Sequence, residues 1–209
     1  MKKRRDISGN AGFTLVELII AIAIMAILAS AIGIAVVHYI RKAHASNAQE
    51  ELRTIVSAVE MGLISSYADD HDMNLNKTYT AEDGASMPCG VLTNYMLSRA
   101  QNQSVNGVSD ADALEYYFAE MVLDELNAKH GSEYKFLNFT GDEDEPLGMN
   151  CKSFYQQFGC PGVIVVYGKE GKVLFAQYYN SGCLVQYVPG DGYTYLEDVN
   201  EFVGTPTIQ

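Results

Sequence analysis

The hydrophobic positions of this chain begin with a continuous apolar run near the N-terminus. From Leu18 to Val37 the sequence LIIAIAIMAILASAIGIAVV contains no charged residue. About 20 apolar residues, each adding 1.5 Å of helix, span the ~30 Å hydrocarbon core of a bilayer. The run therefore predicts a membrane-spanning helix.

Past this run, apolar residues recur every three or four positions, which indicates a helix that is apolar on one face only. The recurring positions are Ala45, Ala48, Leu52, Ile55, Val59, Gly62 and Leu63. Because no proline interrupts residues 13–67, we predict one helix of about 50 residues. Its hydrophobic part would comprise residues 13–40, and residues 41–67 would pack on a globular head formed by residues 68–209.

Helical and turn-rich segments alternate in the first half of this head. Residues 69–88 are polar and predict a loop, and residues 91–101 have a weak helical pattern. A clearer amphipathic pattern predicts a helix near 109–130, which Ser109 or Asp110 would cap and Gly131 would end.

The rest of the head predicts strands. Residues 134–139 alternate, and apolar segments at 163–167, 172–179, 184–188 and 193–196 are separated by turn sequences such as GKEG and PGDG. The fold class we predict is α+β, with an antiparallel sheet of four or more strands that covers the second half of the long helix.

Charge is distributed unevenly and narrows the range of functions. The net charge is −12, yet the first residues include the basic cluster KKRR at 2–5. From Phe13 onward, 10 basic residues stand against 25 acidic ones, a net of −15. Such an acidic body repels nucleic acids, so we expect no nucleic-acid binding. No catalytic motif of the serine hydrolase, zinc protease, P-loop or dinucleotide-binding type is present, and we expect neither an enzyme nor a cofactor.

Metal binding has weak support in the sequence. The cysteines form no CxxC pair and lie far from the four histidines, which argues against zinc. Four consecutive acidic residues at 142–145 could hold calcium, although a solvated acidic loop is the simpler interpretation. The cluster at 69–72 has the same two interpretations.

The four cysteines form an even set that favours disulfides in an exported chain, with three possible connectivities. Cys151 and Cys160 flank a short segment, so we predict that they pair and that Cys89 pairs with Cys183. Four reduced, buried thiols are the alternative.

The N-terminus itself allows three interpretations. It could be a simple membrane anchor, or a secretory signal cleaved at Ala29-Ser30-Ala31. Neither explains why the carboxylate Glu17 stands at the start of the apolar run, where a charged residue is costly and usually functional. The third interpretation rests on a short basic leader that ends in Gly12, followed by FTLVE at 13–17 and a long apolar helix. In these features the segment resembles the N-terminus of type IV prepilins.

That resemblance implies a processing route and a role in assembly. A prepilin peptidase would remove residues 1–12 by cutting after Gly12, and Phe13 would become the N-methylated first residue. Glu17 and the new amine of Phe13 would then be the assembly residues, because a buried charge is tolerable when a neighbouring subunit supplies its counter-ion. The resemblance implies a lollipop-shaped subunit, in which the head is joined to the long helix. Before assembly, the N-terminus would lie in the cytoplasm.

The resemblance also implies partners: other copies of the chain, the peptidase and methyltransferase, an assembly platform with its ATPase, and the cytoplasmic membrane. The mature subunit would end in an extracellular pilus. A pseudopilin or minor pilin of a type II secretion or DNA-uptake machine would share the same motif. An adhesin-like surface protein that never polymerises is the alternative from another class, and its mature chain would start at Ile32.

Overall fold

The structure is a computed structural model of the whole chain. It describes residues 13–68, 73, 75–81, 84–101, 110–130, 151–169, 171–196 and 207–208. Two units, Met1–Ala43 and His44–Gln209, are each compact and are described separately. The predicted leader (1–12), the alternating segment 134–139 and both acidic clusters (69–72 and 142–145) lie outside the described residues.

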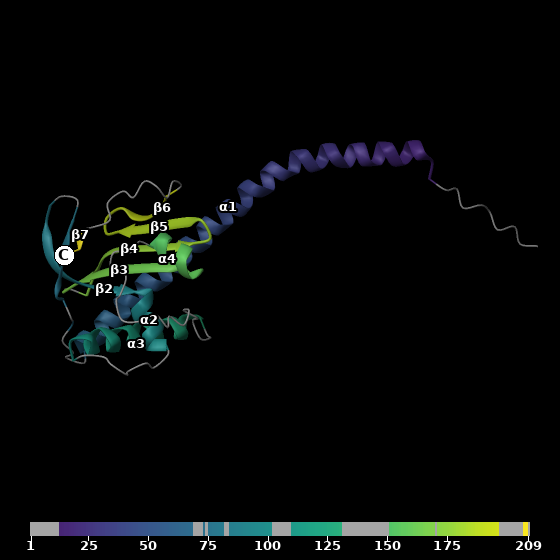
Figure 1. The fold of residues 1–209 in the computed structure, drawn as a ribbon. Coiled ribbons are helices and arrows are strands. Elements are labelled where there is room, and N and C mark those ends of the chain that lie inside the picture. Colours follow the sequence, from purple (N-terminus) through teal and green to yellow (C-terminus); the bar gives the residue numbers. More distant parts are fainter. Residues whose placement is uncertain are drawn as a thin grey trace, which may run out of the picture. The chain divides into compact units, whose positions relative to one another are not determined.

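The first element, α1 (Leu15–Ala68), confirms the long helix expected from the sequence (Figure 1). In its first part, as far as Ile40, the large apolar side chains are exposed. In the second unit, by contrast, a stripe of α1 is buried in the core of the head. The buried apolar members of this stripe are Ala48, Leu52, Ile55, Val56, Ala58, Val59 and Leu63.

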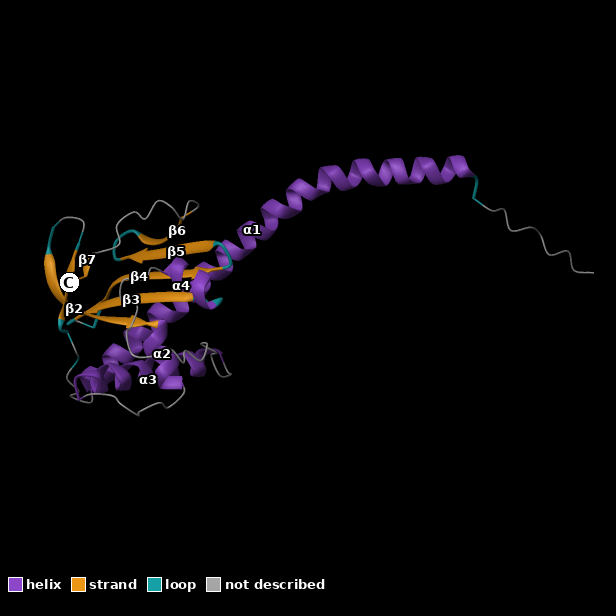
Figure 2. Ribbon diagram, in the orientation of Figure 1, coloured by secondary structure: helices purple, strands orange, loops and turns teal. Residues whose placement is uncertain are grey.

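The head contains a seven-stranded sheet whose strands lie in the order β6-β5-β4-β3-β2-β1-β7, with every pairing antiparallel (Figure 2). The strands and helices that follow α1 are β1 (Lys77–Thr80), β2 (Ser86–Thr93), α2 (Asn94–Gln101), α3 (Asp110–His130), α4 (Cys151–Phe158), β3 (Gly162–Gly168), β4 (Val173–Asn180), β5 (Cys183–Val188), β6 (Gly192–Leu196) and β7 (Thr207–Ile208). The predicted α+β class is confirmed, as are the helix near 109–130 and the four C-terminal strands.

Four elements of the head depart from the sequence-based expectations. The loop predicted for 69–88 contains β1 and the start of β2, and the helix predicted for 91–101 begins only at Asn94. Pro88 argues against a strand because it has no N–H to donate, yet β2 forms and Pro88 lies opposite Thr78 of β1. The segment between Cys151 and Cys160 forms α4, which is too short to show a clear helical period.

One face of the sheet and the helices α1, α2 and α3 form the main core. Its buried residues come from the stripe of α1, from α2 and α3, and from β2 to β5. Helices α1 and α3 approach closely at Gly62, where an added Cβ would lie 3.0 Å from the side chain of Val122. Lys129, near the end of α3, donates a hydrogen bond of 2.6 Å to Ser57 of α1. The buried stripe therefore makes α1 part of the head's core.

Tyr167 fixes the centre of this core. It is buried on β3, its ring contacts that of Phe118 at 4.7 Å, and it lies across Gly90 of the neighbouring strand. A Cβ at position 90 would fall 2.3 Å from the ring, so only glycine fits there.

Asn94 joins the start of α2 to the start of β3. Its buried side chain donates to the carbonyl of Pro161 and accepts from the N–H of Val163. Both polar ends of this amide are thereby satisfied, as burial of a polar group requires. The two bonds hold the β2–α2 junction against the strand that pairs with β2.

The opposite face of the sheet contains two smaller clusters. One is formed by Tyr79, Cys89, Val91, Val166 and Phe175, and the other by Cys151 of α4 with Tyr179 and Leu184. Helix α4 lies close against the sheet at Gly162. A Cβ on this residue would fall 2.2 Å from the carbonyl oxygen of Cys151.

Candidate functional site

Thr14 and Glu17 form a reciprocal hydrogen-bonded pair at the start of α1. The backbone N–H of Thr14 donates to Oε2 of Glu17 at 2.9 Å, and the Thr14 hydroxyl donates to the same oxygen at 2.8 Å. In return, the N–H of Glu17 donates to the Thr14 hydroxyl oxygen at 3.3 Å. This is a capping box, in which the residue before the helix and the third helical residue satisfy one another's exposed donors.

The capping box gives Glu17 a function in the single chain that our sequence analysis did not identify. The signal was present, since Thr-x-x-Glu directly before an apolar helix is the pattern of such a box. The carboxylate lies in the first turn of α1, where the helix dipole also favours an anion. Glu17 is therefore positioned by its own chain, with its carboxylate held at the end of the helix.

Phe13 precedes the capping box directly. Its side chain is 89% exposed. Its peptide bond to Thr14 supplies the N–H that Glu17 accepts. Gly12, the residue expected before the cleaved bond, lies outside the described residues. The structure thus describes two of the three predicted processing and assembly residues: Glu17 lies in the first turn of α1, and Phe13 lies two residues before the helix begins.

The helix that follows exposes its apolar side chains on all sides. Those more than 45% exposed are Leu15, Val16, Leu18, Ile19, Ile20, Ile22, Ile24, Met25, Ile27, Leu28, Ile32, Val37, Tyr39 and Ile40. Among the described residues, no helix is both long enough and apolar enough to cross a membrane. The side chains of Ala31, Ile34 and Ala35 are not among those described.

The four cysteines are free and buried, so neither predicted disulfide is formed in the structure. Cys89 lies on β2 and Cys183 on β5, with β3 and β4 between them. Three strand spacings amount to roughly 14 Å, whereas a disulfide requires Cα atoms within about 7 Å. The two side chains also belong to clusters on opposite faces of the sheet. The fold therefore rules out the pairing of Cys89 with Cys183.

Cys151 is the first residue of α4, and Cys160 follows the end of this helix by two residues. The thiol of Cys151 points to the sheet and lies 3.7 Å from the carbonyl oxygen of Gln177 on β4. Burial raises the pKa of Cys151 to about 12, and it also raises those of Cys89 and Cys160. Thiols with raised pKa values are poor nucleophiles, which favours a packing role for these three residues.

Among the residues that the structure describes, no group of three or more histidine, cysteine, aspartate or glutamate side chains is arranged to hold a metal ion. The two acidic clusters considered for calcium are not covered by this statement, because they lie outside that part of the chain.

Comparison with known families gives one match. Residues 7–33 match the family described as the prokaryotic N-terminal methylation motif, which is the prepilin-type cleavage and methylation motif. Comparisons with curated proteins and with solved structures gave no match. The motif spans Gly12, Phe13 and Glu17, and it supports a pilin-like or pseudopilin protein, a structural class and not an enzymatic one. It also implies processing by a prepilin peptidase and assembly into pilus-like polymers.

Proposed function

We propose that this chain is a structural subunit of a type IV pilus. The observation that supports this proposal most strongly is the methylation motif at 7–33, whose glutamate is held in a capping box at the start of an exposed apolar helix. In this proposal, a prepilin peptidase cuts between Gly12 and Phe13, and the amine of Phe13 is N-methylated.

Before assembly, residues 13–40 would hold the subunit in the cytoplasmic membrane. The uncharged run from Leu18 to Val37 and the KKRR cluster ahead of it support an orientation with the N-terminus in the cytoplasm. An assembly platform and its ATPase would then transfer the subunit into an extracellular filament. The exposed apolar surface of α1 would pass there from lipid to contacts with other copies. Because lipid tails are as apolar as these side chains, close packing between helices and paired charges would favour the filament.

Glu17 would determine the register of neighbouring subunits. Cleavage exposes an ammonium group on Phe13, and a buried ammonium without a counter-ion is strongly unfavourable. The capping box fixes the Glu17 carboxylate at the helix end, so a neighbour's amine can pair with it without first ordering the side chain. Assembly in any other register would leave both charges unpaired in a low-dielectric core.

The test combines protein chemistry with two substitutions at one position. Mass spectrometry of the mature protein is expected to find N-methyl-Phe13 at its N-terminus. Glu17→Gln keeps an acceptor for the capping box and removes the charge, whereas Glu17→Ala removes both. We expect both variants to be processed and membrane-inserted, and both to yield few filaments in the sheared fraction.

Other results would contradict the proposal. Normal filament yield from Glu17→Gln would show that the charge is not needed for assembly. A mature chain that starts at Ile32 would indicate a conventional signal peptidase and a secreted binding protein. Processing at Phe13 with no filaments on wild-type cells would favour a pseudopilin or minor pilin of a secretion or DNA-uptake machine.

A further inference from the structure

Arg41 and Lys42 occupy a position where membrane insertion disfavours basic residues. They follow the uncharged run Leu18–Val37 closely, on the flank that the proposed orientation places outside the membrane. Lysine and arginine are normally concentrated on the cytoplasmic flank, and an excess on the other side weakens the orientation signal. Both side chains are exposed on α1. A favourable interaction elsewhere would offset this disadvantage.

The charge distribution of the two units indicates where that interaction lies. Between Phe13 and Ala43 the side-chain charges are those of Glu17, Arg41 and Lys42. From His44 to Gln209 there are 8 basic and 24 acidic residues, a net of −16. The basic pair of one subunit is therefore attracted to the acidic head of another when the two approach within about one Debye length, ~10 Å at 0.1 M salt.

One surface of the head combines carboxylates with tyrosine rings. We call it the acid–tyrosine flank and define it by Glu50 and Glu60 of α1, Tyr187 of β5 and Tyr193 of β6. The two tyrosines are cross-strand partners whose ring centres are 4.7 Å apart. Burial raises the pKa of both, the neighbouring Glu60 raises both further, and the pKa of Tyr193 reaches about 12. Both rings thus remain neutral beside the carboxylates at ordinary pH.

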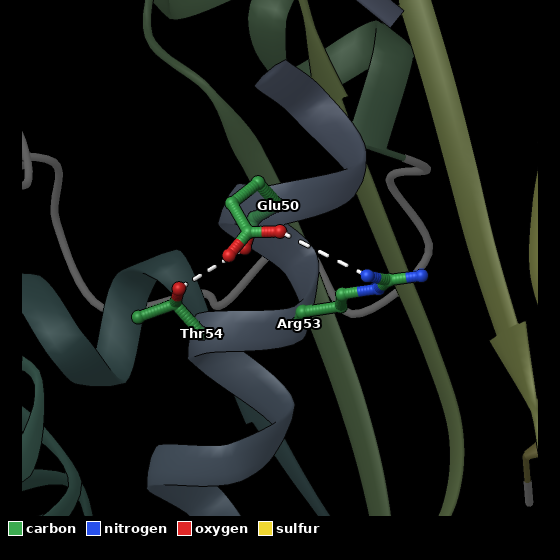
Figure 3. A network of polar contacts seen from close by, with 3 residues as sticks. All are labelled: Glu50, Arg53 and Thr54. Carbon is green, nitrogen blue, oxygen red and sulfur yellow. Dashed lines mark hydrogen bonds and ion pairs between the residues drawn. The ribbon is translucent and has the colours of Figure 1, made fainter. Parts of the chain in front are cut away.

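Arg53 shows that this flank already binds a guanidinium. Its Cζ atom lies 5.1 Å from the centre of the Tyr193 ring. Its Nη1 atom lies 3.9 Å from the carboxylate of Glu50 (Figure 3). Figure 3 shows Glu50 between Arg53 and Thr54, whose hydroxyl donates to the Glu50 backbone carbonyl at 3.0 Å. A ring face together with a carboxylate is the environment that favours a basic side chain.

The flank also retains exposed surface for a second cation. The side chain of Glu50 is 75% exposed, so its carboxylate can be reached beyond its contact with Arg53. Tyr195 points to the same side of β6 as Tyr193 and is 39% exposed. A cation approaching from outside would therefore meet one carboxylate that is mostly in water and a further partly open ring.

We propose that Arg41 and Lys42 of one subunit dock on the acid–tyrosine flank of a second copy of this chain. The inference rests on the proposed function, because it needs copies packed side by side through α1. Anionic lipid headgroups are the competing ligand for Arg41 and Lys42. In that case the acid–tyrosine flank would not take part in the contact, because Glu50 and Glu60 repel anionic headgroups. The contact would bind two subunits outside the apolar part of the helix.

Reciprocal charge reversal tests this contact. We expect R41E/K42E and E50R/E60R each to lower the yield of sheared filaments at least about tenfold, because like charges facing each other are costly. The four substitutions combined should restore most of the yield. Lys169→Glu, which reverses an exposed lysine on the β3–β4 turn, is the matched control and should assemble normally. Thermal melts of each variant show whether the head remains folded.

A crosslink gives an independent measurement. Benzoylphenylalanine at position 42 should photo-crosslink to a second copy, and mass spectrometry should find the adduct on the peptide that contains Tyr193. Normal assembly of either double variant, or no rescue by the combination, would overturn the inference. Loss of membrane retention by R41E/K42E, with normal assembly of E50R/E60R, would assign the basic pair to lipid headgroups and overturn it too. Absence of N-methyl-Phe13 in the wild type would instead remove the proposed function itself.

Discussion

The two parts of α1 have the same secondary structure and opposite relations to their surroundings. In the first unit, the large apolar side chains of α1 that the structure describes are exposed. In the second unit, the apolar side chains form a stripe, and Leu52, Ile55 and Val59 are fully buried. A helix that is apolar all round is stable only where it is surrounded by other apolar groups. The first part thus depends on a partner, a membrane or other copies, whereas the second part is satisfied by its own head.

The difference teaches that helix formation and stability come from different residues in the two parts. The first part consists mainly of residues with branched or long apolar side chains. It begins with a capping box, so the start of the helix is fixed by local hydrogen bonds. The second part gains its stability from tertiary packing against α3 and the sheet. Substitutions in the two parts are therefore expected to affect different measurements.

The largest difference should come from glycine substitutions. Gly90→Val would place its side chain inside the ring of the buried Tyr167, so we expect loss of the folded head, a cost of more than about 4 kcal/mol. Gly33 in the first part of α1 has no atom within 4 Å of an added Cβ. Gly33→Ala is the matched control and should leave the melting of the head unchanged in detergent.

A leucine in each part provides the next comparison. Leu52→Ala removes a fully buried side chain, and we expect it to lower the free energy of unfolding of the head by about 2–5 kcal/mol. Leu28 is 55% exposed in the first part, so Leu28→Ala should not change head stability and should instead reduce filament yield. Denaturant unfolding followed by tyrosine fluorescence measures the first effect. Equal destabilisation by the two variants would show that the two parts do not differ in this way.

The smallest effect is expected at the helix start. Thr14→Ala removes the capping box, which costs about 1 kcal/mol of local helix stability, while Thr14→Ser should retain the box. Hydrogen exchange of the first amides of α1 in detergent micelles measures this loss, and the head should show no change. If Thr14→Ala and Thr14→Ser exchanged at the same rate, the hydrogen bonds seen here would not contribute to stability.

The sequence identified the elements whose pattern is long or regular. The apolar period from Ala45 to Leu63 predicted the second part of α1, and the pattern near 109–130 predicted α3. Apolar segments between glycine-containing turns predicted the four C-terminal strands. The processing motif could also be recognised from FTLVE at 13–17, because its position and spacing are specific.

The remaining features depend on contacts between distant residues. β2 contains Pro88 and Gly90, which locally oppose a strand, yet it pairs with β1 and β3, and Tyr167 of β3 packs across Gly90. The disulfide prediction failed because sequence separation does not show which strands lie between Cys89 and Cys183. The acid–tyrosine flank combines residues from α1, β5 and β6, and no local pattern brings these segments together.

The packing of Tyr167 over Gly90 also has an evolutionary consequence. A mutation at either position changes the space available to the other, so the two positions should co-vary. In related chains, a side chain at position 90 should accompany a smaller residue at position 167, and a chain that retains the tyrosine should retain the glycine. Their joint variation would identify chains that share this head, even where the surrounding surface has diverged beyond recognition.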